Sequence, residues 1–266
     1  APDNISYVGF LCLLNCKKFW NYLSHFAYYG MVVARSDPSA LKHKGLTYFF
    51  LDMKTPGVEA KPIKQISGSA NFNEVFFNDV RIPDSQRLGA KGDGWKVALT
   101  TLMNERLAVG DPPGLDFDQI FEATKEIEVE DGLAIKNSEV RQKMADWYVQ
   151  SRGLQYTKYR SMTALSKGQT PGPELSISKL VTASKMQEVS SYALDLMDMA
   201  GYVHHDKNPV MRNLFQNGYF FSAAMRIAGG TDEVLRNIIA ERVLGLPQDE
   251  RPDKKVPFNE LPSGKN

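Results

Sequence analysis

The sequence has 266 residues, of which 42% are hydrophobic and 24% charged, and its 32 basic and 31 acidic side chains leave a formal net charge of +1. These values exclude collagen-like, low-complexity and disulfide-rich scaffolds. Because the chain has no basic run, it also lacks the electrostatic attraction that nucleic acid binding needs. Its two cysteines, Cys12 and Cys16, are typical of a reducing compartment.

The first feature along the chain is an apolar run at residues 8–14 (VGFLCLL). Its length of about seven residues is far below the roughly twenty that cross a bilayer, and no basic segment precedes it. We therefore expect no membrane span, no secretory signal and an intracellular location, in a bacterial cytoplasm rather than a mitochondrial matrix. Because the chain starts with Ala1 in mid-pattern, we also expect a shortened N-terminus.

Residues 27–82 predict a β-sheet unit. Segments rich in β-branched and aromatic residues lie at 31–35, 46–52 and 73–77 and are separated by turn signals. The aromatic residues Trp20 and 26–29 are candidates for stacking on a planar cofactor. The pattern alone favours the alternative, that they pack in a core.

From Asp93 onward the pattern is helical. One face of the first helix carries residues spaced by three and four: Trp95, Ala98, Leu102, Glu105 and Val109. Further helices are predicted at 138–167, with Ser138 as N-cap, and at about 174–200, 208–227 and 231–245. The tail, 248–266, is predicted to be an extended arm. A sheet followed by long helices predicts an α+β fold with an antiparallel helical bundle.

Glu105 is the most informative position of the first helix. A carboxylate within an apolar stripe costs free energy unless it is paired, and an unpaired one has a raised pKa. Such a group suits a general base that removes a weakly acidic C–H proton. Periodicity alone favours the alternative, a buried ion pair with an arginine from elsewhere in the chain.

A second candidate site is the segment 229–233 (GGTDE). Two glycines permit close backbone approach, and Thr231 or Asp232 can cap the next helix, whose positive end favours an anion or an electron-rich ligand edge. Glu233 can accept hydrogen bonds from a ribose or complement the helix dipole. Without other evidence the pattern favours a plain C-cap followed by an N-cap.

Other catalytic patterns are weak or absent in the sequence. His204 and His205 are adjacent, and only Asp206 lies near them at ligand spacing, so we expect no metal site. The sequence has no Gly-x-Ser-x-Gly elbow, phosphate-binding P-loop or Gly-x-Gly-x-x-Gly motif. Serine hydrolase chemistry and nucleotide binding through those folds are therefore not indicated.

Several separated segments, in register from about residue 20 to 247, closely resemble the acyl-CoA dehydrogenase family. The segments are 46–58 (LTYFFLDMKTPGV), 72–83 (FNEVFFNDVRIP), 92–95 (GDGW), 104–106 (NER) and 227–247 (IAGGTDEVLRNIIAERVLGLP). The resemblance implies that 1–90 is part of the family's middle β domain, 91–247 its C-terminal antiparallel four-helix bundle and 248–266 a tail. The family's N-terminal helical domain has no counterpart here, nor has the middle-domain segment that contacts the flavin ring and the acyl-CoA.

The family oxidises the Cα–Cβ bond of an acyl-CoA thioester with FAD and passes the electrons to electron-transfer flavoprotein. The resemblance therefore implies FAD, an acyl-CoA substrate, that flavoprotein as a partner, and assembly into dimers or tetramers. In many members the base precedes Gly-Thr in the late motif, where this chain has Gly229. Glu105 matches the base of the branch that includes the isovaleryl and long-chain enzymes, so the resemblance favours a catalytic Glu105.

For the cofactor, the resemblance implies that Thr231 contacts the flavin and Glu233 the adenosine part, with Gly230 in the same site and Trp20 beside the flavin. The segment 21–24 (NYLS) departs from the family, which has small hydroxyl residues there. The family's Arg-x-x-Phe-Gly cofactor motif is also not evident at the second bundle helix. The alternative function is therefore a non-catalytic subunit that pairs with a complete homologue.

Overall fold

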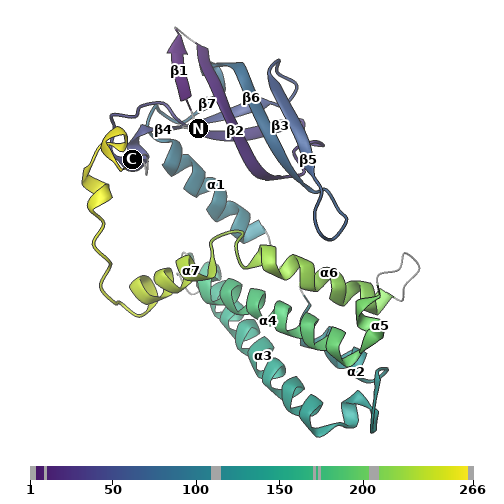
Figure 1. Ribbon diagram of the computed structural model, residues 1–266. Coiled ribbons are helices and arrows are strands. Elements are labelled where there is room, and N and C mark those ends of the chain that lie inside the picture. Colours follow the sequence, from purple (N-terminus) through teal and green to yellow (C-terminus); the bar gives the residue numbers. More distant parts are fainter. Residues whose placement is uncertain are drawn as a thin grey trace. The chain divides into compact units, whose positions relative to one another are not determined.

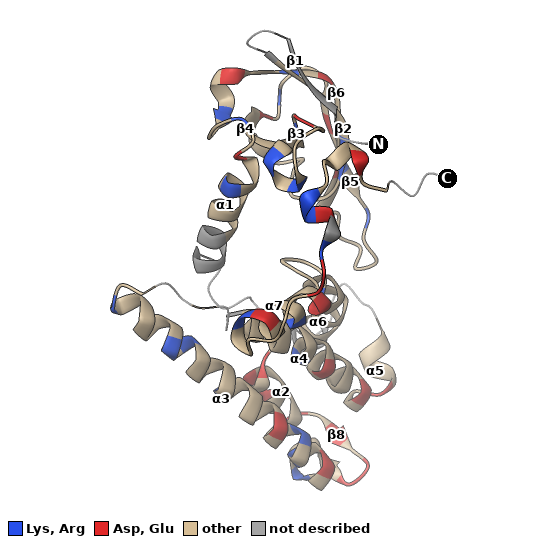
Figure 2. Cartoon of the chain, turned by 90° about the vertical axis from the view of Figure 1, so that its left-hand side faces the viewer, with Lys and Arg blue, Asp and Glu red and all other residues tan. Residues whose placement is uncertain are grey.

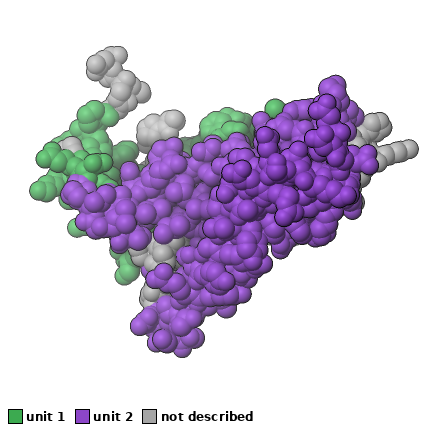
Figure 3. Space-filling model, turned by 90° about the horizontal axis from the view of Figure 1, so that it is seen from below, with its two compact units in different colours: residues 1–110, 249–266 green, residues 111–248 purple. Residues whose placement is uncertain are grey.

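The computed structural model describes residues 4–8, 11–108, 115–169, 172, 175–203 and 210–262. The chain forms two compact units (Figures 1 and 3): a β unit, Ala1–Gly110 with Asp249–Asn266, and a helical unit, Asp111–Gln248. This division confirms the mixed α and β fold class. The units divide after Gly110, whereas the sequence places the domain boundary after residue 90, and the division into family domains stays a prediction.

Within its described residues, the β unit has two antiparallel sheets, with strand orders β1-β2-β6-β5 and β3-β4-β7. The strands are β1 (Asn4–Val8), β2 (Leu11–Tyr22), β3 (Tyr29–Arg35), β4 (Leu46–Asp52), β5 (Val58–Ile63), β6 (Phe72–Pro83) and β7 (Arg87–Leu88). The three predicted strands are confirmed within β3, β4 and β6. The apolar N-terminal run contributes to β2, where Cys12 and Leu14 are fully buried on the core side.

Inward-facing residues of the two sheets form the core of the β unit. Phe49 and Leu51 of β4 pack with Val75, Phe77 and Ile82 of β6. Along β6 the buried residues alternate with more exposed ones, the period of two expected of a half-buried sheet, whereas residues 47–49 of β4 are all buried. Strand β2 pairs antiparallel with β6, with shifts in register between Leu14 and Cys16 and between Lys18 and Asn21.

Helix α1 (Gly94–Ala108) packs against β4, and Tyr48 donates a hydrogen bond to Thr101 Oγ1 at 3.4 Å. Its first residue must be glycine, because a Cβ at Gly94 would lie 2.6 Å from the carbonyl carbon of Thr47.

The predicted apolar stripe of α1 is only partly buried. Ala98 is buried, whereas Trp95 stacks on His43 with ring centroids 4.3 Å apart and stays partly exposed, as does Leu102. The side chain of Glu105 and the whole of Val109 lie outside the described residues. The described residues that share this face are therefore not all buried, because α1 packs with its Ala98 and Thr101 side.

The helical unit is built around α4, which lies beside α3 and α6. Its elements are α2 (Phe117–Thr124), β8 (Glu128–Val129), β9 (Gly132–Leu133), α3 (Ser138–Ser166), α4 (Leu175–Leu196), α5 (Met199–Tyr202), α6 (Val210–Met225) and α7 (Asp232–Ile238). Helix α7 continues into a π-helical turn, Ile239–Val243. Trp147, Met186, Val189 and Phe215 lie in the core between α3, α4 and α6. None of the helices in the described ranges is long and apolar enough to cross a membrane.

Helix boundaries differ from the predictions in three places. The N-cap of α3 is Asn137, not Ser138, and its side chain accepts from Glu139 N at 2.9 Å and Val140 N at 3.3 Å. The predicted helix to residue 200 ends at Leu196, because Asp198 adopts a φ of 48° before α5. Helix α2 and the β8–β9 hairpin were not predicted, since elements this short carry little periodicity.

The C-terminal tail is not a free arm. It forms two 3₁₀ turns, Pro252–Lys255 and Phe258–Glu260, and belongs to the β unit. The backbone N–H of Phe258 donates to Ala40 O at 3.2 Å, and the guanidinium of Arg35 lies 3.5 Å from the Phe258 ring centroid. An ion pair between Lys42 and Asp253 adds a third attachment. The extended-arm prediction is therefore wrong where the tail docks on the residues after β3.

Candidate cofactor-binding site

The loop between α6 and α7 has the backbone conformation that its glycines make possible. Gly229 and Gly230 have φ values of 66° and 109°, in the region that favours glycine. Thr231 is the N-cap of α7, and its hydroxyl oxygen accepts from Val234 N at 3.3 Å. The predicted pattern, a left-handed helix stop followed by a helix N-cap, is thus confirmed. A Cβ added to Gly229 would meet no atom within 4 Å apart from its chain neighbours.

Two side chains of neighbouring helices tie this loop in place. Asp232 is buried, and its Oδ2 accepts from Arg226 Nε at 2.6 Å, while Arg226 Nη1 donates to Gln187 Oε1 of α4 at 2.7 Å. Lys179 of α4 donates from Nζ to Gly230 O at 2.7 Å. Burial lowers the pKa of Lys179, against the opposing charge of Asp232. These partners, which sequence reasoning missed, hold the loop against the bundle core.

A hollow of about 310 Å³ lies beside the loop. It is lined by Gln187, Ala223, Arg226, Ile227, Thr231, Asp232 and Glu233. Hydrogen bonds from the Glu233 backbone N–H and the Thr231 hydroxyl hold the pKa of the exposed Glu233 below its ordinary value, so that carboxylate is ionised at neutral pH. The hollow therefore combines carboxylate acceptors with a guanidinium donor, a set that suits the hydroxyls and ring nitrogens of a nucleotide.

We expect Arg226→Met to destabilise the chain far more than Asp232→Asn. The side chain of Asp232 is 3% exposed and that of Arg226 is 40% exposed. Arg226→Met leaves the buried Asp232 carboxylate without its partner, which costs about 3 kcal/mol in the free energy of unfolding. Asp232→Asn leaves the more exposed Arg226 side chain to be solvated by water, which costs about 1 kcal/mol. Urea unfolding of the two variants checks the order, and equal losses would contradict it.

Trp20 lies in the β unit near the end of β2. It has a φ of 60° and sits at a shift in register between Lys18 and Asn21. The residue is 66% exposed, and its ring meets Phe72 edge-on, with ring centroids 6.0 Å apart. The core packing expected for Trp20 and for the aromatic residues at 26–29 is wrong, since Phe26, Tyr28 and Tyr29 are also exposed. The irregularity in β2 turns the Trp20 ring outward, where it is free to stack on a planar ligand.

One buried polar atom without a hydrogen-bond partner follows Trp20 in the sequence, and another lies in the 229–233 loop. Among the described residues, Asn21 Nδ2 and Asp232 Oδ1 are the buried side-chain atoms without a hydrogen-bond partner. Asn21 follows Trp20 directly, and Asp232 stands between Thr231 and Glu233. An unmade buried hydrogen bond is costly, and in native proteins such atoms are few. Each unit thus has one such atom next to a predicted cofactor residue in the sequence.

The predicted site residues fall into both units. Gly230, Thr231 and Glu233 come together in the helical unit, whereas Trp20 and Glu105 belong to the β unit. Glu105 is carried by α1, but its side chain is outside the described residues, and so are His204, His205 and Asp206. Within the described ranges, no group of three or more His, Cys, Asp or Glu side chains is placed to hold a metal ion.

The model of the family described as "Acyl-CoA dehydrogenase, C-terminal domain" matches residues 92–244. The chain belongs to the acyl-CoA dehydrogenase family. The matched segment contains α1 with Glu105, the whole bundle core and the 229–233 loop. It therefore covers the helices that carry the predicted base and one end of the predicted cofactor site.

Curated acyl-CoA dehydrogenases and solved structures extend the match. Acyl-CoA dehydrogenase FadE34 of Mycobacterium tuberculosis is 33% identical over 238 residues, which cover 89% of this chain and 31% of that protein. Acyl-CoA dehydrogenase IpdE1 of Mycolicibacterium smegmatis is 35% identical over 241 residues, covering 89% and 58%. The ChsE4–ChsE5 complex from Mycobacterium tuberculosis has the same fold, with a TM-score of 0.77, 20% identity and coverage of 94% of this chain and 65% of that chain. The chain thus spans less than two thirds of the length of each of these proteins.

Proposed function

We propose that this chain provides the base and part of the FAD site of an acyl-CoA dehydrogenase that oxidises the Cα–Cβ bond of an acyl-CoA thioester. The observation that carries the proposal is the family match over residues 92–244, which includes both Glu105 and the 229–233 loop. The unpartnered atoms of Asn21 and Asp232 support it, because each adjoins a residue predicted to contact the cofactor.

In this mechanism Glu105 accepts the α-proton of the thioester on a carboxylate oxygen. FAD, when bound, supplies the acceptor for the hydride that leaves Cβ, so one proton and one hydride are removed and a Cα–Cβ double bond forms. Trp20 presents its exposed ring for stacking. Thr231, whose hydroxyl donates to Glu233 and accepts from Val234 N, contacts the flavin, and the ionised Glu233 accepts hydrogen bonds from ribose hydroxyls.

The backbone at Gly230 gives this site its shape. With a φ of 109°, the position disfavours any residue with a Cβ, and its carbonyl is held by Lys179. As the family resemblance implies, we further propose that 91–247 is the C-terminal bundle domain and 1–90 part of the middle β domain. We also propose that the enzyme passes its electrons to electron-transfer flavoprotein and that it assembles into dimers or tetramers.

The visible absorption spectrum of the purified chain tests the cofactor. We expect a flavin band that bleaches when acyl-CoA is added, because the bound flavin becomes reduced. Trp20→Ala and Glu233→Gln should each weaken FAD binding, whereas Tyr28→Ala, which removes another exposed aromatic ring of the β unit, should leave it unchanged. A folded, flavin-free chain that assembles with a complete homologue would contradict this proposal and establish the non-catalytic subunit instead.

A further inference from the structure

The loop that begins at Trp20 has an unusual backbone conformation. Trp20 has a φ of 60° and Leu23 a φ of 52°, in the left-handed region that residues with a Cβ rarely adopt. Between Lys18 and Asn21, strand β2 also has one extra residue against β6. Such conformations persist only where the surrounding structure imposes them. The contacts of residues 20–25 therefore determine that the Trp20 ring points outward.

The side chain of Asn73 on β6 bonds to this loop at more than one point. Asn73 is fully buried. Its Nδ2 donates to Asn21 O at 3.0 Å and to Asn71 O at 3.2 Å, and its Oδ1 lies 2.7 Å from His25 Nδ1. Asn71 O also accepts from Leu23 N at 2.7 Å. One buried amide thus connects both ends of the loop to β6.

These bonds determine the orientation of the Asn73 amide and the position of a hydrogen on His25. Both partners of Asn73 Nδ2 are carbonyl oxygens, which only accept, so the amide nitrogen faces them. Oδ1 then faces His25, whose Nδ1 donates. Nδ1 carries a hydrogen in one neutral tautomer and also in the imidazolium ion. The bond to Asn73 therefore forms in both charge states of His25.

The surface that the loop presents is aromatic and carries none of the four charged residue types. Residues 19–34 contain no Lys, Arg, Asp or Glu, so this stretch is tan throughout in Figure 2. Trp20 and Tyr22 each meet Phe72 edge-on, with ring centroids 6.0 Å and 5.5 Å apart. Because ion pairs of those four residue types do not hold the loop, its conformation depends on hydrogen bonds and ring packing.

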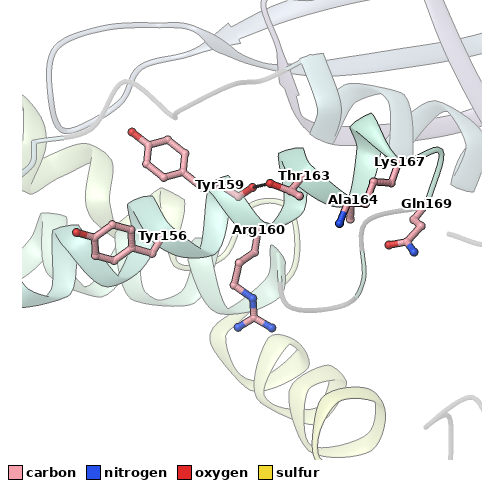
Figure 4. Close-up of a pocket in the computed structure, with 7 residues that line it drawn as sticks. All are labelled: Tyr156, Tyr159, Arg160, Thr163, Ala164, Lys167 and Gln169. Atoms are coloured by element: carbon pink, nitrogen blue, oxygen red, sulfur yellow. Dashed lines mark hydrogen bonds between the residues drawn. The ribbon is translucent and has the colours of Figure 1, made fainter.

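A second exposed aromatic surface shows what is particular to the Trp20 loop. Tyr156 and Tyr159 lie beside a hollow of about 450 Å³ at the end of α3 (Figure 4). Their helix, Ser138–Ser166, contains no residue with a positive φ. A regular helix thus directs those two rings, whereas the direction of the Trp20 ring depends on a disfavoured backbone conformation and the buried amide that bonds to it.

We propose that Asn73 is a positioning residue that sets the conformation of residues 20–25 and so holds the Trp20 ring outward for stacking on FAD, with His25 as its second anchor. Because Asn73 is fully buried, it acts through the loop and does not touch the cofactor. Its effect on FAD binding rests on the proposed function of Trp20. Its effect on the orientation of the ring is measured without any cofactor.

Fluorine NMR of the full chain labelled with 5-fluorotryptophan tests the effect on the ring. The chain has three tryptophans, Trp20, Trp95 and Trp147, and replacing each by Phe assigns its signal. Asn73→Leu keeps the approximate size of the side chain but removes its hydrogen bonds. We expect it to shift or broaden the Trp20 signal. The signals of Trp95 in the β unit and Trp147 in the helical unit should stay in place, which shows that both units are folded.

Asn15 provides a matched control at the other irregularity of β2 and β6. Its Nδ2 donates to Asp79 Oδ1 at 2.9 Å, and its Oδ1 accepts from Asp79 N at 2.8 Å. Asn15→Leu should leave the Trp20 signal in place. An unmoved Trp20 signal in folded Asn73→Leu, or an equal shift in Asn15→Leu, would overturn the proposal.

Variants of His25 decide the question independently, also where Asn73→Leu does not fold. His25→Leu removes the donor and should displace the Trp20 signal. His25→Asn places an amide N–H near the position of Nδ1 and should keep the signal near its original position. An unmoved Trp20 signal in His25→Leu, or equal shifts in the two variants, would remove His25 and its bond to Asn73 from the proposal.

Titration of the same variants with FAD measures the consequence for the cofactor. We expect Asn73→Leu to weaken FAD binding about tenfold, because a ring that samples several orientations is competent to bind only part of the time. Asn15→Leu should bind FAD normally. If Trp20→Ala weakens binding and folded Asn73→Leu does not, this inference is wrong and the proposed function stands. If Trp20→Ala binds FAD as well as the unaltered chain, the proposed role of Trp20 fails, while the fluorine signals still decide whether Asn73 orients the ring.

Discussion

Replacing Glu105 with Gln is expected to abolish acyl-CoA oxidation while leaving flavin content and fold unchanged. Glutamine keeps the size of the side chain but cannot accept the α-proton, and loss of a general base costs about 100-fold to 10,000-fold in rate. The measurement is the rate of flavin bleaching after rapid mixing of the FAD-loaded chain with acyl-CoA. It reports the chemical step directly, before any electron acceptor is involved.

A matched control distinguishes a catalytic loss from a general effect of losing a carboxylate. Glu122→Gln removes an exposed carboxylate on α2 that pairs with Lys125 at 2.7 Å. We expect that variant to keep its rate within about twofold, because an exposed ion pair contributes little to stability. Full turnover of Glu105→Gln would remove Glu105 from the mechanism, whatever the flavin content of the chain.

A buried lysine in the bundle gives the largest expected effect on stability. The Lys185 side chain of α4 is 1% exposed, and its Nζ lies 2.6 Å from Asp116 Oδ1 and 2.8 Å from Ser151 Oγ of α3. Asp116 is also the N-cap of α2, where its side chain accepts from Phe117 N at 2.6 Å. This cluster therefore joins the start of α2 to the middle of α3 and α4.

We expect Asp116→Ala to cost about 4 kcal/mol in the free energy of unfolding, because it leaves the buried ammonium without its counter-charge and removes a helix cap. Lys185→Met should cost about 1 kcal/mol or less, since methionine suits the apolar surroundings and Asp116, with a side chain 49% exposed, can be solvated by water. Urea unfolding measures both. The double variant should regain most of the loss of Asp116→Ala, and a loss as large as that of the single variant would refute the assignment.

The same cluster makes stability depend on pH in a defined direction. Burial by itself would raise the pKa of Asp116, but hydrogen bonds from Lys185, Ser151 and Phe117 N hold it below its ordinary value. The pKa of Asp116 is therefore lower in the folded state than in the unfolded state. Its contribution to the free energy of unfolding is complete above about pH 4 and is lost as the pH falls through the folded-state pKa. Below about pH 4, the unaltered chain should therefore lose stability more steeply than Asp116→Ala.

Local signals predicted the fold where neighbouring residues decide the structure. The β-branched strands and the Thr231 cap were found from the sequence, because each depends on residues a few positions apart. The cap of α3 was assigned to Ser138 when Asn137 makes the bonds, since both residue types suit that position equally well. Nothing in the helical pattern marked Lys185 as buried, because lysines on helices are mostly exposed and its partner Asp116 is 69 positions away.

For the site, the sequence by itself determined the family resemblance, the candidate base Glu105 and the Gly-Gly-Thr loop, because motif residues and turn chemistry are local. Only the tertiary structure showed that Arg226, Gln187 and Lys179 anchor that loop and that Trp20 points outward. It also revealed the unpartnered atoms of Asn21 and Asp232. The physical reason is that burial and hydrogen bonding depend on which distant segments of the chain come into contact, and local sequence patterns do not indicate those contacts.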